Sequence, residues 1–381
     1  VRRRLLEERR RVEGEPASGL RFRAGATEVF LDAARRSRVR RGESLGLAES
    51  LALTALVDAQ IDYLDEPLPA GIRYGPGRTL VQGAYRTLRF GLPPGAFAPV
   101  KAPDLFGVRY RDSLLWGANE TYPSDVPPSE RIARNGLLVP WIQVHPLTRK
   151  PLPDALALLR LPLYRRMGRL LQHAVPPPAP APSTGLERAR FARGRTIYET
   201  TCTPCHGRYE FDPEPMPDGS PGLRSRPIRY REQLPPLDAL GTDPNYAAAL
   251  DDDYAAAWYG TLYYKVDLFG SRKTGTYVAR PHLGLRLRAP YLHNASIPNL
   301  EALLTKPGGR PLRFRVGRAV PLDDRAVGLA VESPAANEDD PAAGVHCWDG
   351  TLPGNRPVGH EFGTDLDEED KVALIEYLKR L

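Results

Sequence analysis

Residues 200–207 read TTCTPCHG, and this stretch determines how the second half of the chain is interpreted. Two of the chain's three cysteines, Cys202 and Cys205, stand three positions apart, and His206 follows at once. Three residues make about one helical turn, so both sulfur atoms are expected on the same side of the chain. The motif therefore predicts a site that uses two thiols and one imidazole together.

Three kinds of site use cysteines and histidine in this way. A thioredoxin-like redox pair requires a strand before the motif, whereas residues 185–202 read as a helix. A structural zinc site requires four ligands, and His346 and Cys347 are the candidates to complete it. Covalent attachment of haem c requires two cysteines for the haem vinyl groups and an adjacent histidine as axial ligand of the iron. Haem is the favoured interpretation, and zinc stays the alternative.

The segment VPPPAPAPS at residues 175–183 is the clearest domain boundary, because its prolines favour an extended, semi-rigid spacer. We therefore expect a basic arm at 1–15, a helical, loop-rich domain without a visible haem motif at 16–174, the Pro-rich linker at 175–183 and a haem domain at 184–381. The chain contains 40 prolines and 34 glycines. The predicted fold is thus mainly α with many loops.

Two further segments predict helices. Residues 152–174 have leucines at helical spacing, with Pro162 as a break. The chain closes with TDLDEEDKVALIEYLKRL, in which Thr364 or Asp365 is expected to cap a helix whose first turn is acidic. Its buried stripe is expected to consist of Val372, Ile375 and Leu378.

Charge and hydropathy limit the possible partners. The basic arm contains no aromatic residues between its arginines, so we interpret it as a solvated tail and expect no nucleic-acid partner. The most apolar helical stretch, residues 43–65, is interrupted by acidic residues and predicts a core helix, not a transmembrane segment. No signal peptide is expected within the chain, which starts at Val1, so a leader could precede it.

The cysteine motif at the end of a helix, together with the closing helix ALIEYLKRL at 373–381, resembles the cytochrome c domain. In that fold two terminal helices cross and pack a small residue against an aromatic one. The resemblance implies that Gly194 or Tyr198 contacts Tyr377.

Further segments resemble a narrower group, the di-haem cytochrome c peroxidase and rubber-oxygenase-like cytochromes. These segments are LGTDPNYA (240–247), APYLHNASIPNLEALL (289–304), GNRPVGHEFGTDL (354–366), YGPGRTL (74–80) and APVKAPDLFGVRYRDSLLWGANE (98–120). The group has two haems with one attachment motif each, and this chain has one motif. The other haem site either precedes Val1 or has been lost.

The axial ligand opposite His206 is expected to be His360, with His293 as the alternative. The resemblance implies His360, because related cytochromes use a histidine at the matching VGHEFG motif as the distal ligand of their second haem. Gly359 and Gly363 would let the backbone approach a flat ring closely. The metal ligands are thus predicted to be His206 and His360.

The surroundings of the haem can also be predicted. His206 is expected to donate its other ring N–H to a backbone carbonyl, for which the loop 221–223 is a plausible source. The arginines that follow this loop are candidates to pair with haem propionates or are simply a solvated basic segment. They are Arg224, Arg226, Arg229 and Arg231.

The function that these observations favour is electron transfer by a c-type cytochrome with one covalent haem c per chain, because two histidine ligands leave the iron closed. One alternative is a haem peroxidase- or oxygenase-like enzyme in which this haem is a relay or the active centre. The other is a zinc-stabilised interaction domain. Covalent haem attachment implies the periplasm or the outer surface of a bacterium, with a protein redox partner. The oligomeric state stays open.

Overall fold

The structure is a computed structural model, and it describes part of the chain: Gly46, residues 78–136 without 80, 94, 103–105, 119, 123 and 124, residues 153 and 155, and residues 158–381 without 267–269, 272, 318 and 332–344. Residues 74–138 and 158–381 form one compact unit, to which all elements below belong. The predicted arm at 1–15 and, apart from Gly46, the predicted helix at 43–65 lie outside the described residues.

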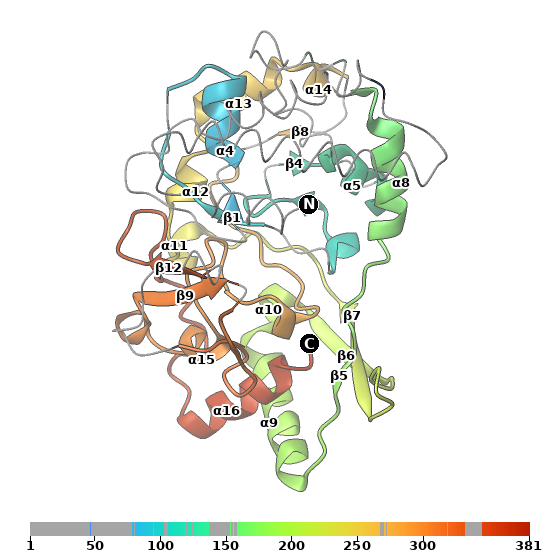
Figure 1. The fold of residues 1–381 in the computed structure, drawn as a ribbon, viewed down its shortest axis with the longest axis vertical. Coiled ribbons are helices and arrows are strands. Elements are labelled where there is room, and N and C mark those ends of the chain that lie inside the picture. The colour runs from blue at the N-terminus through green and yellow to red at the C-terminus, as the bar shows by residue number, and fades with distance from the viewer. Residues whose placement is uncertain are drawn as a thin grey trace. The chain divides into compact units, whose positions relative to one another are not determined.

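Helices, together with the long loops that connect them, make up most of this unit, and the remainder consists of short antiparallel strands (Figure 1). The α-helices are α4 (Val81–Ala84), α5 (Pro128–Gly136), α8 (Leu161–Leu171), α9 (Gly185–Thr201), α10 (Thr203–His206), α11 (Leu237–Leu240), α12 (Asn245–Ala248), α13 (Asp252–Tyr259), α14 (Leu262–Lys265), α15 (Leu300–Leu303) and α16 (Glu368–Leu378). A π-helical turn, η1 (Tyr85–Arg89), and three 3-10 turns, η2 (Val108–Tyr110), η3 (Leu285–Leu287) and η4 (Pro307–Gly309), complete the described helices.

The strands pair in sheets of two or three. They are β1 (Arg78–Thr79), β2 (Val100–Lys101), β3 (Ser113–Leu114), β4 (Glu120–Thr121), β5 (Ala179–Pro180), β6 (Arg208–Pro213), β7 (Gly222–Arg229), β8 (Gly270–Ser271), β9 (Arg313–Gly317), β10 (Leu322–Asp323), β11 (Gly328–Leu329) and β12 (Val345–Asp349). The pairings are β1–β2, β10–β11, β12–β9, β3–β4–β8 and β5–β7–β6. With this many strands, the mainly α expectation holds only loosely.

Helices α9 and α16 cross and pack against each other, side by side in Figure 1. At the crossing, a Cβ atom on Gly194 would lie 1.9 Å from the carbonyl oxygen of Ala373, so only glycine allows this approach. The ring centroids of Tyr198 and Tyr377 lie 5.1 Å apart, and both rings are fully buried. Both predicted contacts of the crossing are therefore present.

The two crossing helices begin at different kinds of cap. Thr184 accepts from the backbone N–H of Glu187, whose carboxylate in turn accepts from Thr184, which makes a reciprocal capping box at the start of α9. At α16 the cap is Asp367, which accepts from the N–H of Asp370. The prediction of Thr364 or Asp365 as the cap is thus wrong, because both residues lie in the turn at 362–365 that precedes the helix.

The buried side of α16 also differs from the expected stripe. Ile375 and Leu378 are buried as predicted, whereas Val372 is 36% exposed. Ala373, Leu374 and Tyr377 are buried instead of Val372. Other parts of the chain therefore cover α16 on more than one side, whereas the predicted stripe of three residues assumes a single buried face.

Pro162 follows a break in the helical segment, as expected: residues 155 and 158 are helical, residues 159 and 160 form a turn, and α8 begins at Leu161. Pro162 stands in the first turn of α8, where the missing backbone N–H would have no intrahelical partner in any case. Further along, α8 packs closely on α5: a Cβ atom on Gly168 would lie 2.1 Å from the carbonyl oxygen of Ser129. The proline therefore stands at the start of α8, directly after the predicted interruption.

The Pro-rich segment 175–183 packs against the rest of this unit. Ala179 is 4% exposed and pairs with Leu223 as part of β5, and the N–H of Ala181 donates to the carbonyl of Pro221. Gly222 and Leu223, at the start of β7, are thus paired with β5. The division of the chain at 16–174, 175–183 and 184–381 stays a prediction.

Residues of the first half contribute to the same unit as the second half. The guanidinium of Arg78 stacks 3.6 Å from the ring centroid of Trp348 and donates to Asn355 Oδ1 at 2.7 Å. The ring of Phe90 meets Tyr254 edge-on at 5.5 Å between centroids. These contacts hold the described residues of 78–101 against the second half of the chain. Lys101, at the end of this segment, lines the cavity described next.

Candidate functional site

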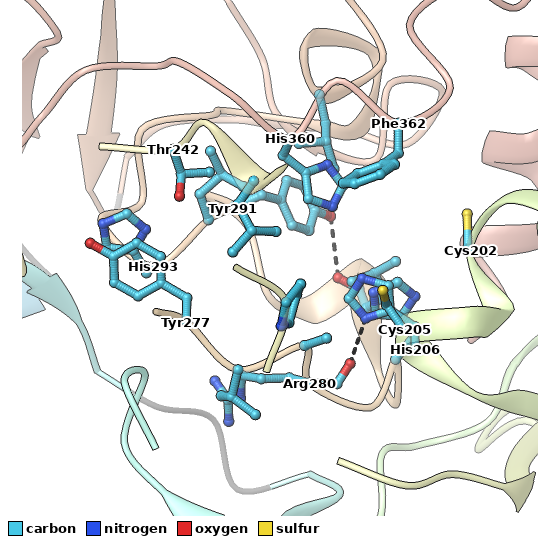
Figure 2. A pocket seen from close by; sticks show the side chains of 18 of the residues that line it. Cys202, Cys205, His206, Thr242, Tyr277, Arg280, Tyr291, His293, His360 and Phe362 are labelled. Carbon is cyan, nitrogen blue, oxygen red and sulfur yellow. Dashed lines mark hydrogen bonds between the residues drawn. The ribbon is translucent and has the colours of Figure 1, made fainter. Parts of the chain in front are cut away.

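The cysteine motif lies at the end of α9 and continues into the single turn α10. The N–H of His206 donates to the carbonyl of Cys202 at 2.9 Å, so the motif closes one helical turn. Cys202 and Cys205 both line one cavity, together with His206 (Figure 2). Burial raises the pKa of Cys202 to about 12, so this thiol stays protonated at neutral pH. The expected grouping of two sulfurs and one imidazole is present.

The cavity next to the motif has a volume of about 320 Å³, within the range of pockets that hold organic ligands. Apolar residues form most of its wall: Leu240, Val278, Ala279, Leu285, Tyr291, Leu292, Leu300, Leu303, Leu304, Leu374 and Leu378. Two of them come from α16, so the helix crossing also shapes the cavity. An apolar wall of this kind suits a large flat hydrophobic group and excludes water from it.

The imidazole of His206 is held in one tautomer. Its Nδ1 lies 2.8 Å from the carbonyl oxygen of Arg280. A carbonyl only accepts, so Nδ1 must hold the proton, and Nε2 keeps a free lone pair. Burial lowers the pKa of His206 to about 4, so the ring is neutral at neutral pH. His206 is thus prepared to bind a metal through Nε2.

The carbonyl that orients His206 is not the one expected. Loop 221–223 was the predicted source, but its carbonyls are used elsewhere: that of Pro221 accepts from Ala181, and that of Gly222 accepts from Glu214. The true acceptor, Arg280, lies 74 residues after His206 in the sequence.

His360 enters the cavity from a loop that precedes α16. Its backbone N–H donates to the carbonyl of Leu240 at 2.7 Å. A Cβ atom on the neighbouring Gly359 would lie 2.2 Å from the backbone carbon of Gly241, so this glycine permits two chain segments to touch. His360 itself has a φ of 50°, a left-handed conformation that is uncommon outside glycine. The loop therefore positions His360 through tight backbone packing.

The ring of His360 lies near that of His206, and the two ring planes are tilted by 52°. Their centroids lie 6.3 Å apart. For two imidazoles that bind one metal from opposite sides, bonds of about 2 Å and about 1 Å from nitrogen to ring centre give about 6 Å between centroids. Burial lowers the pKa of His360 to about 4, and its buried Nδ1 has no hydrogen-bond partner among the described residues. The pair therefore fits one iron between two neutral rings.

His293 also lines the cavity, but its ring is stacked on Tyr277 with centroids 3.9 Å apart. Figure 2 shows this pair at the end of the cavity that lies away from Cys202 and Cys205. Burial lowers the pKa of His293 to about 3. Its stack with Tyr277 suits a structural role better than that of the ligand opposite His206.

His282 is a cavity residue to which sequence reasoning gave no role. Its ring stacks on that of His206 with centroids 3.8 Å apart, and its Nδ1 lies 3.3 Å from the hydroxyl oxygen of Tyr198. His282 thereby supports the face of His206. The only signal in the sequence is a histidine after proline in RPHLG, which gives no spacing to any motif.

The charged residues of the cavity wall are Lys101, Arg280 and Arg288. Lys101 and Trp116, which also lines the cavity, come from the first half of the chain.

The arginines predicted to meet haem propionates lie elsewhere. Arg224 pairs with Glu214, and Arg226 pairs with Asp212 at 2.9 Å, within the β6–β7 hairpin. The described residues that line the cavity include none of the four predicted arginines, Arg224, Arg226, Arg229 and Arg231.

The zinc interpretation receives no support from the geometry. His346 and Cys347 lie on β12, which pairs with β9, and neither is among the described residues that line the cavity. Within the described part of the chain, no group of three or more histidine, cysteine or acidic side chains is placed to hold a metal ion. Nor does any described helix have the length and apolar character needed to cross a membrane.

Comparison with known proteins points to the same part of the chain. The family model described as RoxA-like, cytochrome c-like, matches residues 275–315, which include Arg280, His282 and His293. The uncharacterized protein y4iJ of Sinorhizobium fredii is 33% identical over 171 residues, which cover 39% of this chain and 27% of the relative. The uncharacterized protein y4iM of the same organism is 28% identical over 219 residues, or 50% of this chain and 45% of the relative. The chain thus spans less than half the length of these relatives, and the family match supports a cytochrome c-like domain in its C-terminal part.

Proposed function

We propose that the chain binds one haem c and transfers electrons. Cys202 and Cys205 form the thioether bonds, His206 is the proximal ligand and His360 is the distal ligand. The observation that supports this assignment best is the spacing of 6.3 Å between two buried neutral imidazoles, directly beside both thiols and within an apolar cavity.

Each residue has a defined part in this proposal. The carbonyl of Arg280 holds the proton of His206 on Nδ1, which leaves the lone pair of Nε2 available to bind the iron. The backbone contacts of Gly359 and Leu240 hold His360 in place. Bound haem supplies an iron that gains and loses one electron. With histidine on both sides of the iron, no ligand position would be left for peroxide or oxygen. Electron transfer is therefore favoured over catalysis at this haem.

The same assignment suggests the cellular setting. Because haem c is attached outside the cytoplasm, we propose the periplasm or the outer surface of a bacterium, and a protein redox partner. The peroxidase- or oxygenase-like alternative requires an open ligand position on this iron or a second haem.

Absorption spectra of the purified protein test the proposal. We expect a sharp α-band on reduction that carbon monoxide leaves unchanged, together with haem that stays with the polypeptide in acidified acetone. A high-spin oxidised spectrum that shifts with carbon monoxide would remove His360 as a ligand and favour the enzyme. A protein without a Soret band that contains zinc would refute the haem assignment altogether.

A further inference from the structure

This inference rests on the proposed function and concerns the end of the cavity opposite the cysteines. Three cations, Lys101, Arg280 and Arg288, line the wall, and no described lining residue is acidic. Arg280 and Arg288 are only 4% and 8% exposed. Whatever else these side chains contact, a wall with three positive charges and no negative one favours an anionic group on whatever fills the cavity.

The three cations lie near one another, and Lys101 and Arg280 lie away from the thiols. The backbone N–H of Lys101 donates to the carbonyl of His293 at 2.7 Å, and its ammonium donates to the carbonyls of Arg288 and, at 2.8 Å, Pro290. Lys101 therefore lies at the His293 end of the cavity, and Figure 2 shows His293 on the side away from Cys202 and Cys205.

Arg280 reaches the same end. Its guanidinium carbon lies 4.7 Å from the ring centroid of Trp116, and the indole N–H of Trp116 donates to the carbonyl of Lys101 at 2.7 Å. Figure 2 shows the side chain of Arg280 extending away from His206, while its carbonyl is bonded to that histidine. Arg288 adjoins both of them: its carbonyl accepts from the ammonium of Lys101, and its guanidinium donates at 2.8 Å to the carbonyl of Pro281, the residue after Arg280.

The chemistry of haem explains this arrangement. Its vinyl groups and its two propionates lie on opposite edges of the macrocycle. With the vinyl edge bonded to Cys202 and Cys205, the propionate edge would face the opposite end of the cavity, where Lys101 and Arg280 lie. Guanidinium and ammonium groups bind carboxylates through charge-assisted hydrogen bonds.

We propose that Lys101, Arg280 and Arg288 bind the haem propionates and that Arg280 also links this end of the haem to the proximal ligand. Its side chain meets a propionate, and its backbone carbonyl holds Nδ1 of His206. Arg280 is thus a positioning residue, since it acts on the iron through His206 and through charge. The segment 98–120 takes part in cofactor binding through Lys101 and Trp116.

The test compares the haem-loaded full chain with its variants Arg280→Gln, Arg288→Gln and Arg280→Lys. A nearby positive charge favours the reduced iron, so Arg280→Gln should lower the reduction potential. We expect about a tenfold change in the reduction equilibrium, which equals 59 mV for one electron. Arg288→Gln should lower the potential in the same direction, Arg280→Lys should restore most of it, and the propionate vibrations in resonance Raman spectra should shift in both glutamine variants.

Arg226→Gln is the matched control, because it removes the same charge from the β6–β7 hairpin, where Arg226 pairs with Asp212. It should leave both readouts at the wild-type values. If Arg280→Gln does not fold, Arg288→Gln and Arg280→Lys decide the question alone. Wild-type potentials and unshifted propionate vibrations in the folded variants would overturn this inference, whereas a wild-type chain without haem would overturn the proposed function instead.

Discussion

At one end of the cavity, Cys202, Cys205 and His206 lie within five consecutive residues at the end of α9. At the other end, the wall is assembled from Lys101, Trp116 and the loop 277–293, which are far apart in the sequence. The comparison shows that attachment of a cofactor can be encoded locally, whereas the charges and hydrogen bonds that surround it depend on the complete fold. The two ends should therefore respond differently to substitution.

Removal of the local end should have the largest effect. We expect the double variant Cys202→Ser, Cys205→Ser to lose all covalently attached haem, because serine forms no thioether with the vinyl groups. Haem staining after denaturing electrophoresis measures this directly. Cys347→Ser is the control and should stain like the wild type, since Cys347 is not among the described residues that line the cavity. Covalent haem in the double variant would contradict the assignment.

His360→Gly tests the long-range part of the ligand set. Glycine accepts the φ of 50° at this position, so the imidazole is removed without backbone strain. The oxidised iron should become high-spin, carbon monoxide should bind after reduction, and added imidazole should restore the wild-type spectrum. His293→Phe, which keeps an aromatic ring against Tyr277, should leave the spectrum unchanged. The opposite result for these two variants would make His293 the ligand.

Gly194→Ala tests whether the helix crossing supports the cysteine end. The new Cβ would meet the carbonyl oxygen of Ala373 at 1.9 Å, so the helices must separate. We expect a loss of about 1–3 kcal/mol in the free energy of unfolding, measured in urea. Gly185→Ala is the control, because nothing lies within 4 Å of its Cβ. Equal stability of the two variants would show that α9 and α16 do not pack this closely.

The last prediction concerns the pH dependence of stability at the far end of the cavity, where only acidic conditions reveal an effect. Burial holds the pKa of His293 at about 3, against about 6.5 in an unfolded chain. Between these values the unfolded state binds the extra proton, so this residue makes stability fall as the pH decreases from 6.5 to 3, by at most about 1.4 kcal/mol per pH unit. His293→Phe should remove that contribution from the slope, measured by denaturation at several pH values. An unchanged slope would mean that His293 is accessible to protons in the folded chain.

Much of the cysteine end could be predicted from the sequence. The motif, the helix before it and the contacts of Gly194 and Tyr198 with Tyr377 follow from local spacing and from the resemblance to cytochrome c. The cap of α16 was misplaced by two to three residues, since Thr364, Asp365 and Asp367 are all good capping residues and only the path of the chain selects among them.

The far end could not be predicted in the same way. Proximity in sequence to the motif predicts that the arginines after it meet the propionates, yet Arg224 and Arg226 pair with carboxylates of their own hairpin. Arg280 and Lys101 give no local signal, because their role depends on which segments the fold brings to the cavity. Loop 221–223 was likewise expected to orient His206, but the carbonyls of Pro221 and Gly222 accept from Ala181 and Glu214 instead.

The contact between Gly194 and Ala373 has a consequence for the order of folding. It closes a loop of about 180 residues, whose entropic cost must be met before the crossing contributes any stability. Helix α9, by contrast, forms from neighbouring residues and begins at its own capping box. In a chain made from its N-terminus, the segment with Cys202 and Cys205 thus exists well before α16 does. The thiols are accessible during that interval, before the later segments fold and half-bury Cys202.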